Sequence, residues 1–350
     1  MAVYALDPLS DSRWDELLRH SRRASVFHSR GWLSALREAY GYHPIAFSTS
    51  AADRPLENGL LCCEIRSWVT GRRLVSLPFS DHCDFLTESG DDQASLLAHV
   101  RQELARKSLG YIEVRPRFAD PPPASANSCL RPSDAFLLHT LSLDPPLDAL
   151  FRNLHKDCIQ RKVRRAERER LAYETGRSDA LLRQFYLLLL ATRRRQGLPP
   201  QPLRWFRQLI YSMGDHLVIR VASKDGRPVA AIITLAFKTT LTYKYGCSDQ
   251  RFHNLGGMPF LFWKTIQEAK DAGMHQLDLG RSEPGEIGLT TFKERLGAHR
   301  AALTYYRMSS RSSPQIVPSV LKCQILRRAI STMPDALLVA AGRLLYRHLG

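Results

Sequence analysis

The sequence predicts an α/β (α+β) protein of two tandem units, each with a mixed, largely antiparallel sheet flanked by helices. Its 350 residues can bury a full core and are long enough for two domains. Short strand patterns and helix-spaced apolar residues follow one another in the same order in both halves. Each half also places a Ser-Asp pair just after its third predicted strand, Ser80-Asp81 and Ser248-Asp249. These observations indicate an internal duplication.

The N-terminal unit, residues 1–145, is expected to open with two helices. The first covers 11–20, and in the second, over 27–42, Trp32, Leu33 and Leu36 recur at helical spacing. Alternating apolar residues and the positions of Gly and Pro predict strands near 44–47, 59–68 and 72–77 with a turn at Thr70-Gly71, a helix over 91–107, a strand over 111–115, a Pro-rich loop over 118–132 and a strand over 135–143.

The C-terminal unit, residues 146–310, is expected to begin with a long basic helix over 147–170. Leu147, Leu150 and Leu154 lie along one side of it. Lys224-Asp225-Gly226 is a strong turn signal between two apolar runs and predicts a hairpin. The elements predicted after the basic helix are the hairpin strands 216–222 and 228–237, a strand over 241–246, a helix over 258–272, a strand over 275–280, a short helix over 290–297 and a strand over 301–308.

The remaining segment, residues 311–350, is predicted to be an amphipathic helical tail. Two apolar stripes are separated at Pro334, and lysines and arginines lie beside them. Two interpretations stay open: the tail packs on the protein, or it makes peripheral contact with an anionic membrane through residues 314–350.

Composition limits the choice of partner and compartment. The net charge of +16 favours an anionic partner such as tRNA, a pyrophosphate-linked substrate or an acidic membrane surface. The seven cysteines show neither an even framework nor zinc-binding spacing, so we expect no metal. Residues 1–10 lack a basic start followed by an apolar core, and no apolar run approaches about 20 residues. A cytoplasmic protein with reduced cysteines is therefore expected, with the inner face of the membrane as its closest peripheral site.

A family resemblance emerges between residues 241 and 297, where polar residues gather at predicted strand ends. The order is Y-x-Y-G-x-S-D, a helix ending in Ala-x-x-x-Gly, then D-x-G-R, then G-L-x-x-F-K-x-x-x-G. This order is similar to that of Fem-type aminoacyltransferases and of their relatives in the GNAT-like superfamily from peptidoglycan and polysaccharide gene neighbourhoods. The resemblance is densest over 150–308, with weaker matches at 27–42 and 78–84. It implies two GNAT-like domains that face one another.

The resemblance also implies where the chemistry takes place. Phe292 and Lys293 are expected in the substrate channel, where a cation offsets charge on a carbonyl oxygen as an amine attacks an ester or thioester. Asp278, close to Arg281, is expected to orient Lys293 or to accept the proton of the amine. The alternatives are an exposed helix lysine and a structural ion pair.

Tyr243 and Tyr245 are expected to share one strand face, since side chains two residues apart point the same way, and one of them to contact the acceptor. Core packing is the alternative for both. Asp249 and His253 are expected to line the following loop. Residues 254–257 keep two glycines but depart from the spacing of acyl-CoA cradles. The departure argues against CoA and fits the degenerate cradle of a Fem-type enzyme, whose donor is an aminoacyl-tRNA.

Two further groups are candidates for substrate binding. Arg161, Lys162, Arg164 and Arg165 form a stretch without an acid and are expected to bind phosphates of tRNA or of a pyrophosphate-linked acceptor, although a solvated face is the alternative. Asp81 and His82 are expected to touch the acceptor across the interface between the units.

Together these residues predict an acyl- or aminoacyltransferase of the Fem-like GNAT superfamily that acts on a cell-envelope or exopolysaccharide precursor. Lys293 and Asp278 are the predicted catalytic pair, and no tightly bound cofactor is expected. Two alternatives remain: an acyl-CoA-dependent N-acyltransferase, and a non-catalytic protein that binds a polysaccharide precursor or acts as a scaffold.

Overall fold

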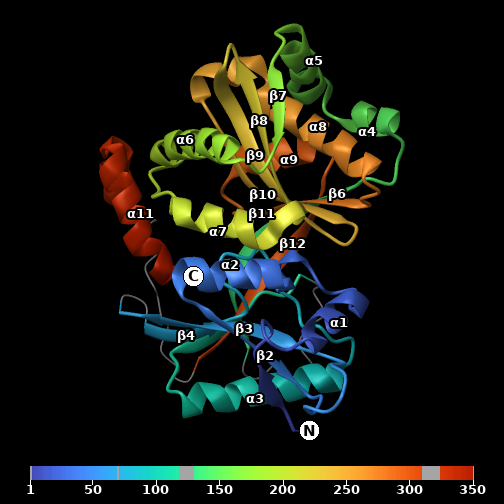
Figure 1. Cartoon of the computed structure of the whole chain (residues 1–350), viewed down its shortest axis with the longest axis vertical. Helices are drawn as coiled ribbons and strands as arrows, with labels where there is room; N and C mark the ends of the chain where they lie inside the picture. Colours follow the sequence, from blue (N-terminus) through green and yellow to red (C-terminus); the bar gives the residue numbers. More distant parts are fainter. Residues whose placement is uncertain (1, 69–70, 118–129, 310–323, 350) are drawn as a thin grey trace.

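The computed structural model describes residues 2–68, 71–117, 130–309 and 324–349 (Figure 1). The strands are β1 (Tyr4–Leu6), β2 (His43–Ser48), β3 (Leu60–Ser67), β4 (Gly71–Val75), β5 (Tyr111–Val114), β6 (Arg131–Ser142), β7 (Ala172–Gly176), β8 (Leu217–Lys224), β9 (Arg227–Phe237), β10 (Thr240–Ser248), β11 (Gln276–Ser282) and β12 (His299–Ser309). The helices are α1 (Arg13–His20), α2 (Arg30–Tyr40), α3 (Gly90–Arg106), α4 (Leu147–Asn153), α5 (Arg161–Arg168), α6 (Asp179–Gln196), α7 (Leu203–Met213), α8 (Gly257–Asp271), α9 (Ile287–Arg295), α10 (Gln324–Thr332) and α11 (Asp335–Leu349). Short helical turns are η1 (Val26–His28), η2 (Lys156–Gln160), η3 (Gly214–His216) and η4 (Gln250–Leu255).

One twelve-stranded sheet runs through both halves of the chain, in the order β1-β2-β3-β4-β5-β12-β6-β11-β10-β9-β8-β7. β6 ends the N-terminal half but pairs with β11, and β12 ends the C-terminal half but pairs with β5. The two exchanged strands pair with each other at the centre of the sheet. The predicted class of two similar, largely antiparallel units is confirmed, whereas the exact division at residue 145 stays a prediction.

Each half contains one parallel strand pair at an equivalent position. β4 pairs with β5 in the N-terminal half, and β10 pairs with β11 in the C-terminal half. The second pairing extends only from Thr240 to Thr242 on β10, after which β10 continues along β9 alone. The space that opens where these two strands separate positions the candidate site described below.

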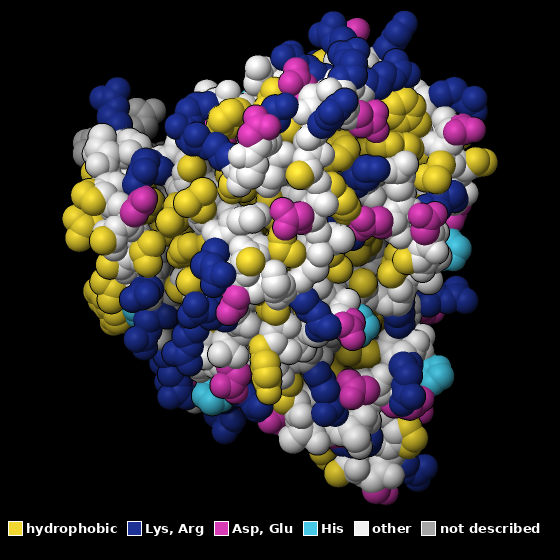
Figure 2. All heavy atoms as spheres, turned by 45° about the horizontal axis from the view of Figure 1, so that its top comes forward, with side chains coloured by type: hydrophobic (Ala, Val, Ile, Leu, Met, Phe, Trp, Pro, Cys, Tyr) yellow, Lys and Arg dark blue, Asp and Glu magenta, His cyan; other side chains and the backbone are white. Residues whose placement is uncertain are grey.

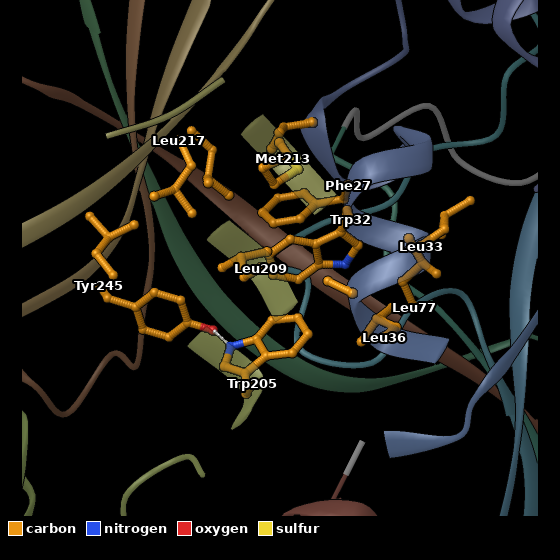
Figure 3. Packing of buried hydrophobic residues seen from close by; sticks show 14 of the residues in the cluster. Phe27, Trp32, Leu33, Leu36, Leu77, Trp205, Leu209, Met213, Leu217 and Tyr245 are labelled. Atoms are coloured by element: carbon orange, nitrogen blue, oxygen red, sulfur yellow. Dashed lines mark hydrogen bonds between the residues drawn. The ribbon is translucent and has the colours of Figure 1, made fainter. Parts of the chain in front are cut away.

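Helices cover both faces of the sheet and join the halves into one core. α6 and α7 pack on one face of the C-terminal sheet and α8 on the other, while α2 and α7 cross between the halves (Figure 1). Trp32 of α2 and Trp205 of α7 meet edge to face, with ring centroids 5.2 Å apart (Figure 3). Gly31 permits this crossing, because a Cβ there would lie 2.7 Å from the sulfur of Met213.

The predicted long helix over 147–170 is wrong. The structure divides it into α4, η2 and α5, with Leu154 in an extended conformation between α4 and η2. The amide of His155 donates to the carbonyl oxygen of Arg295 at 2.9 Å instead of continuing α4. The side chain of His155 then caps the next turn by accepting from the amide of Cys158. A contact from α9 therefore breaks a helix that local periodicity favours.

Most other predicted elements occur within a few residues of their expected positions, including the 224–226 hairpin, where Asp225 and Gly226 both have positive φ as a type I′ turn requires. Residues 118–129 of the Pro-rich loop and Thr70 of the predicted turn lie outside the described residues.

The described part of the tail packs on the protein. α10 contacts α6, and Leu338 of α11 is fully buried. Tyr42 donates a hydrogen bond to the carbonyl oxygen of Arg347 at 3.0 Å, and Gly342 lies so close to Pro200 that a side chain would overlap its carbonyl oxygen. α11 therefore contacts both halves, as its position along one side of the molecule in Figure 1 shows. Within the described residues, no helix combines the length and apolar character needed to cross a membrane.

Candidate active site

A cavity of about 420 Å³ lies beside the separating strand β10, between α8, α9, α5 and α6. We call it the α8 pocket, after the helix that begins at its wall. Its lining residues are Cys158, Ile159, Lys162, Thr192, Arg195, Gln196, Val229, Ala230, Tyr243, Gly246, Cys247, Ser248, Phe252, His253, Gly257, Met258, Pro259, Gly288, Leu289, Phe292 and Arg295.

The α8 pocket is suited to an anion. Three cations, Lys162, Arg195 and Arg295, lie among its lining residues, and the described lining contains no acid. Burial, together with Arg195 and Lys162, lowers the pKa of His253, so its imidazole is neutral at neutral pH and shares a 2.9 Å hydrogen bond with the hydroxyl of Ser248. The first amides of α8 have no acceptor inside the helix and add a partial positive charge.

Tyr243 brings a hydroxyl group into the α8 pocket. A bulge in β10 between Tyr243 and Tyr245 turns Tyr243 toward Phe262 of α8. Its hydroxyl group lies directly over Gly246, where any Cβ would overlap it. Burial raises the pKa of Tyr243, so the phenol stays protonated and available as a donor. Among the described residues the hydroxyl forms no hydrogen bond with a protein group, which leaves it free for a ligand.

The expectation that Tyr243 and Tyr245 share a face is wrong, because the bulge at Lys244 shifts the alternation by one residue. Tyr245 points to the opposite side of the sheet, into the core around Trp205 (Figure 3). Its hydroxyl accepts a hydrogen bond from the indole nitrogen of Trp205 at 2.8 Å. Of the two predicted tyrosines, only Tyr243 lines the pocket.

The start of α8 is partly covered by α5. Gly256 has φ +80° and caps α8, and a side chain there would overlap the carbonyl oxygen of Lys162. The glycine is needed both for its left-handed conformation and for this close approach. The basic helix α5 therefore closes over the loop that an ordinary phosphate cradle leaves open. In Figure 2, Lys and Arg side chains gather at the top of the molecule, where Figure 1 places α5.

A second polar group lies where the two halves meet, and we call it the seam network. It consists of Asp81, His82, Lys244, Asp278, Arg281 and Tyr305. Lys244 and Asp81 form a buried ion pair at 3.0 Å, and Arg281 donates to the hydroxyl of Tyr305 at 2.7 Å. Burial lowers the pKa of Lys244, and Asp81 partly restores it. Because Tyr243 and Lys244 are adjacent on β10, the seam network and the α8 pocket share that strand.

His82 and Asp278 form the most buried pair of the seam network. The Nε2 atom of His82 lies 3.0 Å from a carboxylate oxygen of Asp278, and both side chains are almost fully enclosed. Burial is the largest influence on the pKa of Asp278 and raises it, but His82, the amide of Gly280 and Arg117 together hold the pKa below its usual value. The Nδ1 atom of His82 is buried and has no hydrogen-bond partner in the described structure.

Lys293 stabilises an irregular turn of β11. A bulge between Asp278 and Arg281 contains Gly280, with φ +69°. The Lys293 ammonium donates to the carbonyl oxygens of Gly280 and Arg281 and to the hydroxyl of Ser282, at 2.9 to 3.1 Å. Burial lowers its pKa to about 8, with Asp81 and Asp278 opposing the shift. All three of its protons have acceptors within the protein, and Lys293 is not among the described pocket-lining residues.

At the corresponding place in the N-terminal half, the chain after β4 and the chain after β5 are bonded to each other. Arg115, just beyond β5, is buried and donates to the carbonyl oxygen of Leu77 at 2.6 Å, and it pairs with Glu113 at 2.8 Å. The amide of Cys83 bonds to the carbonyl oxygen of Arg115 at 2.7 Å, which ties the chain after β4 to the chain after β5. In the C-terminal half, β10 and β11 instead separate beside the α8 pocket.

The structure divides the predicted site residues into three sets. Tyr243, His253, Phe292 and Lys162 line the α8 pocket, and Asp81, His82, Asp278 and Arg281 belong to the seam network. The remaining substrate-binding candidates lie elsewhere: Tyr245 in the core, Asp249 paired with Arg251, and Arg161, Arg164 and Arg165 on the surface of α5.

The sequence suggested that Asp278 pairs with its neighbour Arg281. In the structure, Asp278 pairs with His82 instead. Sequence reasoning also missed Arg195, Arg295, Lys244 and Tyr305. Arg195 and Arg295 lie in the last turns of α6 and α9, where cations are ordinary because they complement the helix dipole. Lys244 lies between the two predicted site tyrosines, and the sequence does not reveal the β-bulge that directs its side chain to the seam network.

Comparison with known proteins agrees with this geometry. Residues 154–294 match the acetyltransferase (GNAT) domain, a segment that contains α5 to α8, all of α9 but its last residue, and every lining residue of the α8 pocket except Arg295. No curated protein sequence matches the chain.

Solved structures resemble nearly the whole molecule. The crystal structure of FemX matches with a TM-score of 0.67 at 12% identity, covering 87% of this chain and 97% of that one. The C-terminal domain of a putative lysylphosphatidylglycerol synthetase from Agrobacterium fabrum matches with a TM-score of 0.56 at 15% identity over 87% and 92%. A tandem GNAT protein from the clavulanic acid pathway gives 0.56 at 13% over 89% and 99%.

The domain match assigns a GNAT acetyltransferase domain to residues 154–294, and the solved structures show that the whole chain has a tandem GNAT fold. More narrowly, the chain has the two-unit fold of the Fem-like proteins of the GNAT superfamily.

Proposed function

We propose that the protein is an acyl- or aminoacyltransferase that binds an anionic donor in the α8 pocket and acylates an amine or hydroxyl of a cell-envelope or exopolysaccharide precursor. The observation that carries the proposal is the charge of the pocket, which presents Lys162, Arg195 and Arg295 and no described acid. The resemblance to Fem-type enzymes supports aminoacyl-tRNA as the donor.

A polyanionic donor fits the surroundings of the pocket better than a small one. Lys162 reaches the pocket from α5, whose outer surface also carries Arg161 and Arg164. The side chain of Arg161 is 74% exposed, and its nearest partner oxygen, on Asp157, is 3.9 Å away. This ion pair is therefore weak in water, and Arg161 can bind a ligand. A cationic surface that leads to a cationic pocket attracts a phosphate backbone and places its end at the pocket.

In the proposed reaction, the acceptor nitrogen or oxygen attacks the carbonyl carbon of the donor ester. A new amide or ester bond forms, the bond to the donor oxygen breaks, and the proton lost by the acceptor balances the one taken up by the leaving oxygen. We assign acceptance of that proton to His82, oriented by Asp278. Lys293 remains our proposal for stabilising the carbonyl oxygen, which requires it to exchange one of its protein acceptors for the substrate.

The test is a binding titration of the purified protein with charged tRNA and, separately, with acyl-CoA, over a series of salt concentrations. Charged tRNA is expected to bind with an affinity that falls steeply with salt. Replacing Lys162 and Arg195 by Gln is expected to lower the affinity about 10- to 100-fold and to reduce the salt slope by about two.

Arg101→Gln is the matched control, because Arg101 is an exposed cation on α3, the helix equivalent to α8 in the N-terminal half. It is expected to leave tRNA binding unchanged. The control removes one cation and the pocket variant two. If the control therefore lost half as much binding free energy as the pocket variant, net charge alone would attract the RNA, and the proposal would fail.

Acyl-CoA is the second candidate donor, because α8 begins at Gly256 and Gly257, and Gly257 lines the pocket. The close packing of Lys162 on Gly256 argues against it. Acyl-CoA would be the donor if it bound saturably, if charged tRNA did not displace it, and if the Lys162 and Arg195 double variant no longer bound it.

A further inference from the structure

One face of α11 is bound to the protein and the other is left to solvent. The bound face includes Leu338, which is fully buried, and His348, which accepts a hydrogen bond from the indole nitrogen of Trp68 through Nε2 at 3.0 Å. The backbone carbonyl of His348 also accepts from Arg73 at 3.0 Å. The helix is therefore fixed in orientation, and its outer face is a stable surface.

The outer face of α11 is apolar and basic. Leu337 and Leu344 recur at a spacing of seven residues and are 58% and 68% exposed. Arg343 and Arg347 are exposed beside them, and the sequence from 336 to 350 contains no acid. Asp335, which precedes this stretch, is paired with Arg194. In Figure 2, hydrophobic side chains gather on the side of the molecule where Figure 1 places α11.

Trp68 extends this surface from the N-terminal half. Trp68 directly follows β3 and lies beside the C-terminal turn of α11. It is 88% exposed, although its indole nitrogen donates a hydrogen bond to His348. Burial, with Arg347 and Arg73, lowers the pKa of His348, so the neutral imidazole can accept that bond. Hydration of the exposed apolar ring is unfavourable, so covering the ring with an apolar partner would lower the free energy.

We propose that Trp68, Leu337, Leu344, Arg343 and Arg347 form a docking surface for an anionic lipid bilayer. Leucines at helical spacing enter the boundary between headgroups and acyl chains, tryptophan prefers that depth, and the two arginines meet the lipid phosphates. The charge selects this occupant, since the surface is cationic and has no described acid left unpaired. The surface is separate from the α8 pocket, so the inference does not depend on the identity of the donor.

The protein provides its own reporter for this surface. Of the five tryptophans, Trp14, Trp32 and Trp205 are fully buried and Trp263 is 8% exposed, so Trp68 dominates the emission that a water-soluble quencher reaches. The experiment mixes the full chain with vesicles of phosphatidylcholine alone or with added phosphatidylglycerol. It records flotation together with tryptophan emission and iodide quenching.

Only vesicles that contain phosphatidylglycerol are expected to carry the protein, with a blue shift and loss of quenching that disappear in Trp68→Phe. Leu344→Gln is expected to lower vesicle partition about tenfold. Each of Arg343→Gln and Arg347→Gln should lower it about fivefold. Tyr211→Ser is the matched control, because Tyr211 on α7 is 84% exposed and lies outside the surface; it should bind like the wild type.

Failure to float with anionic vesicles at low salt would overturn the proposal and would point to a protein partner for this face. Flotation that is unaffected by Leu344→Gln, with Trp68 still open to iodide, would also overturn it. In that case the net charge of the protein, acting through another surface such as α5, would be the cause.

Discussion

The two halves share one architecture but differ at the place where a parallel strand pair separates. In the N-terminal half, the buried Arg115 bonds to the carbonyl oxygen of Leu77, and its own carbonyl oxygen accepts from the amide of Cys83, so the chain after β4 is tied to the chain after β5. In the C-terminal half the same place is a cavity of about 420 Å³ with three cations around it. Under the proposed function, one copy of a repeated fold is stabilised by internal bonds at this place, and the other copy binds the donor there.

The equivalent helices differ in the same sense. α3 begins with Asp91 and Asp92 in its first turn, which neutralise the positive end of the helix dipole. α8 begins with Gly257, Met258 and Pro259 and has no acid in its first turn. An anion therefore gains at the start of α8 and is repelled at the start of α3.

Replacing Arg115, which ties the ends of β4 and β5 together, should have the largest effect. Arg115→Met is expected to lower the free energy of unfolding by about 3 kcal/mol or more, because Glu113 is left buried with a single remaining partner, Arg307. Urea unfolding measures the loss. Donor affinity, measured on the folded fraction, should be unchanged. A variant that weakens donor binding without losing stability would contradict the division between the halves.

Glycine substitutions at the starts of the two equivalent helices form a matched pair. Gly256→Ala is expected to cost about 2–4 kcal/mol, since an alanine there must adopt a left-handed conformation and would overlap the backbone of Lys162. Gly90→Ala, at the start of α3, meets nothing within 4 Å and should be neutral or slightly stabilising. Thermal unfolding of both variants tests the pair, and equal effects would remove the argument that α5 closes over α8.

The buried cations of the two halves should respond differently to pH. Burial lowers the pKa of Arg115, but Glu113, Tyr305 and Cys83 together raise it above its usual value, so Arg115 stays charged throughout. Burial instead lowers the pKa of Lys293 to about 8 from an ordinary 10.5. Between those values the unfolded chain binds more protons than the folded one. Stability should therefore rise with pH through this window, by up to about 3 kcal/mol.

The same titration bears on the role of Lys293. The difference in stability between wild type and Lys293→Met isolates its contribution across the window, because the other titrating groups are common to both proteins. If the ammonium stabilises the carbonyl oxygen, the transfer rate should fall above about pH 8, and Lys293→Arg should move that fall to higher pH. A rate that rises through pH 8 would instead assign Lys293 the role of a base.

The smallest expected effect concerns the hydroxyl in the pocket. Tyr243→Phe should weaken donor binding about fivefold through the loss of one hydrogen bond. Gly246→Ala should weaken it further, because the new methyl group displaces the Tyr243 hydroxyl. The double variant should bind better than Gly246→Ala alone, since the phenylalanine removes the overlapping oxygen. If the double variant shows no such recovery, Tyr243 does not occupy the position assigned to it.

Local pattern was sufficient to predict most strands and helices, because periodicity and turn residues act over a few positions. It failed where distant parts of the chain decide the conformation. The predicted helix over 147–170 is broken by a hydrogen bond from His155 to Arg295, 140 residues away in sequence. The faces of Tyr243 and Tyr245 depend on how β10 pairs with β9, which their own alternation does not reveal.

The candidate site shows the same limit. The motifs identified Asp278, Lys293 and His82 but not their relations, because the bond between His82 and Asp278 joins residues 196 positions apart. The cations Arg195 and Arg295 look like ordinary ends of helices until the fold brings them to one cavity. The sequence could predict which residues are candidates for the site, whereas the contacts between them are visible only in the structure.

The most direct test of the division between the halves is hydrogen exchange measured by mass spectrometry, with and without saturating charged tRNA. The account predicts slower exchange in the amides of 246–260, at the end of β10 and the start of α8, and no change in 76–92, the equivalent segment of the N-terminal half. Protection of 76–92 with no change in 246–260 would contradict the assignment of the donor to the C-terminal half.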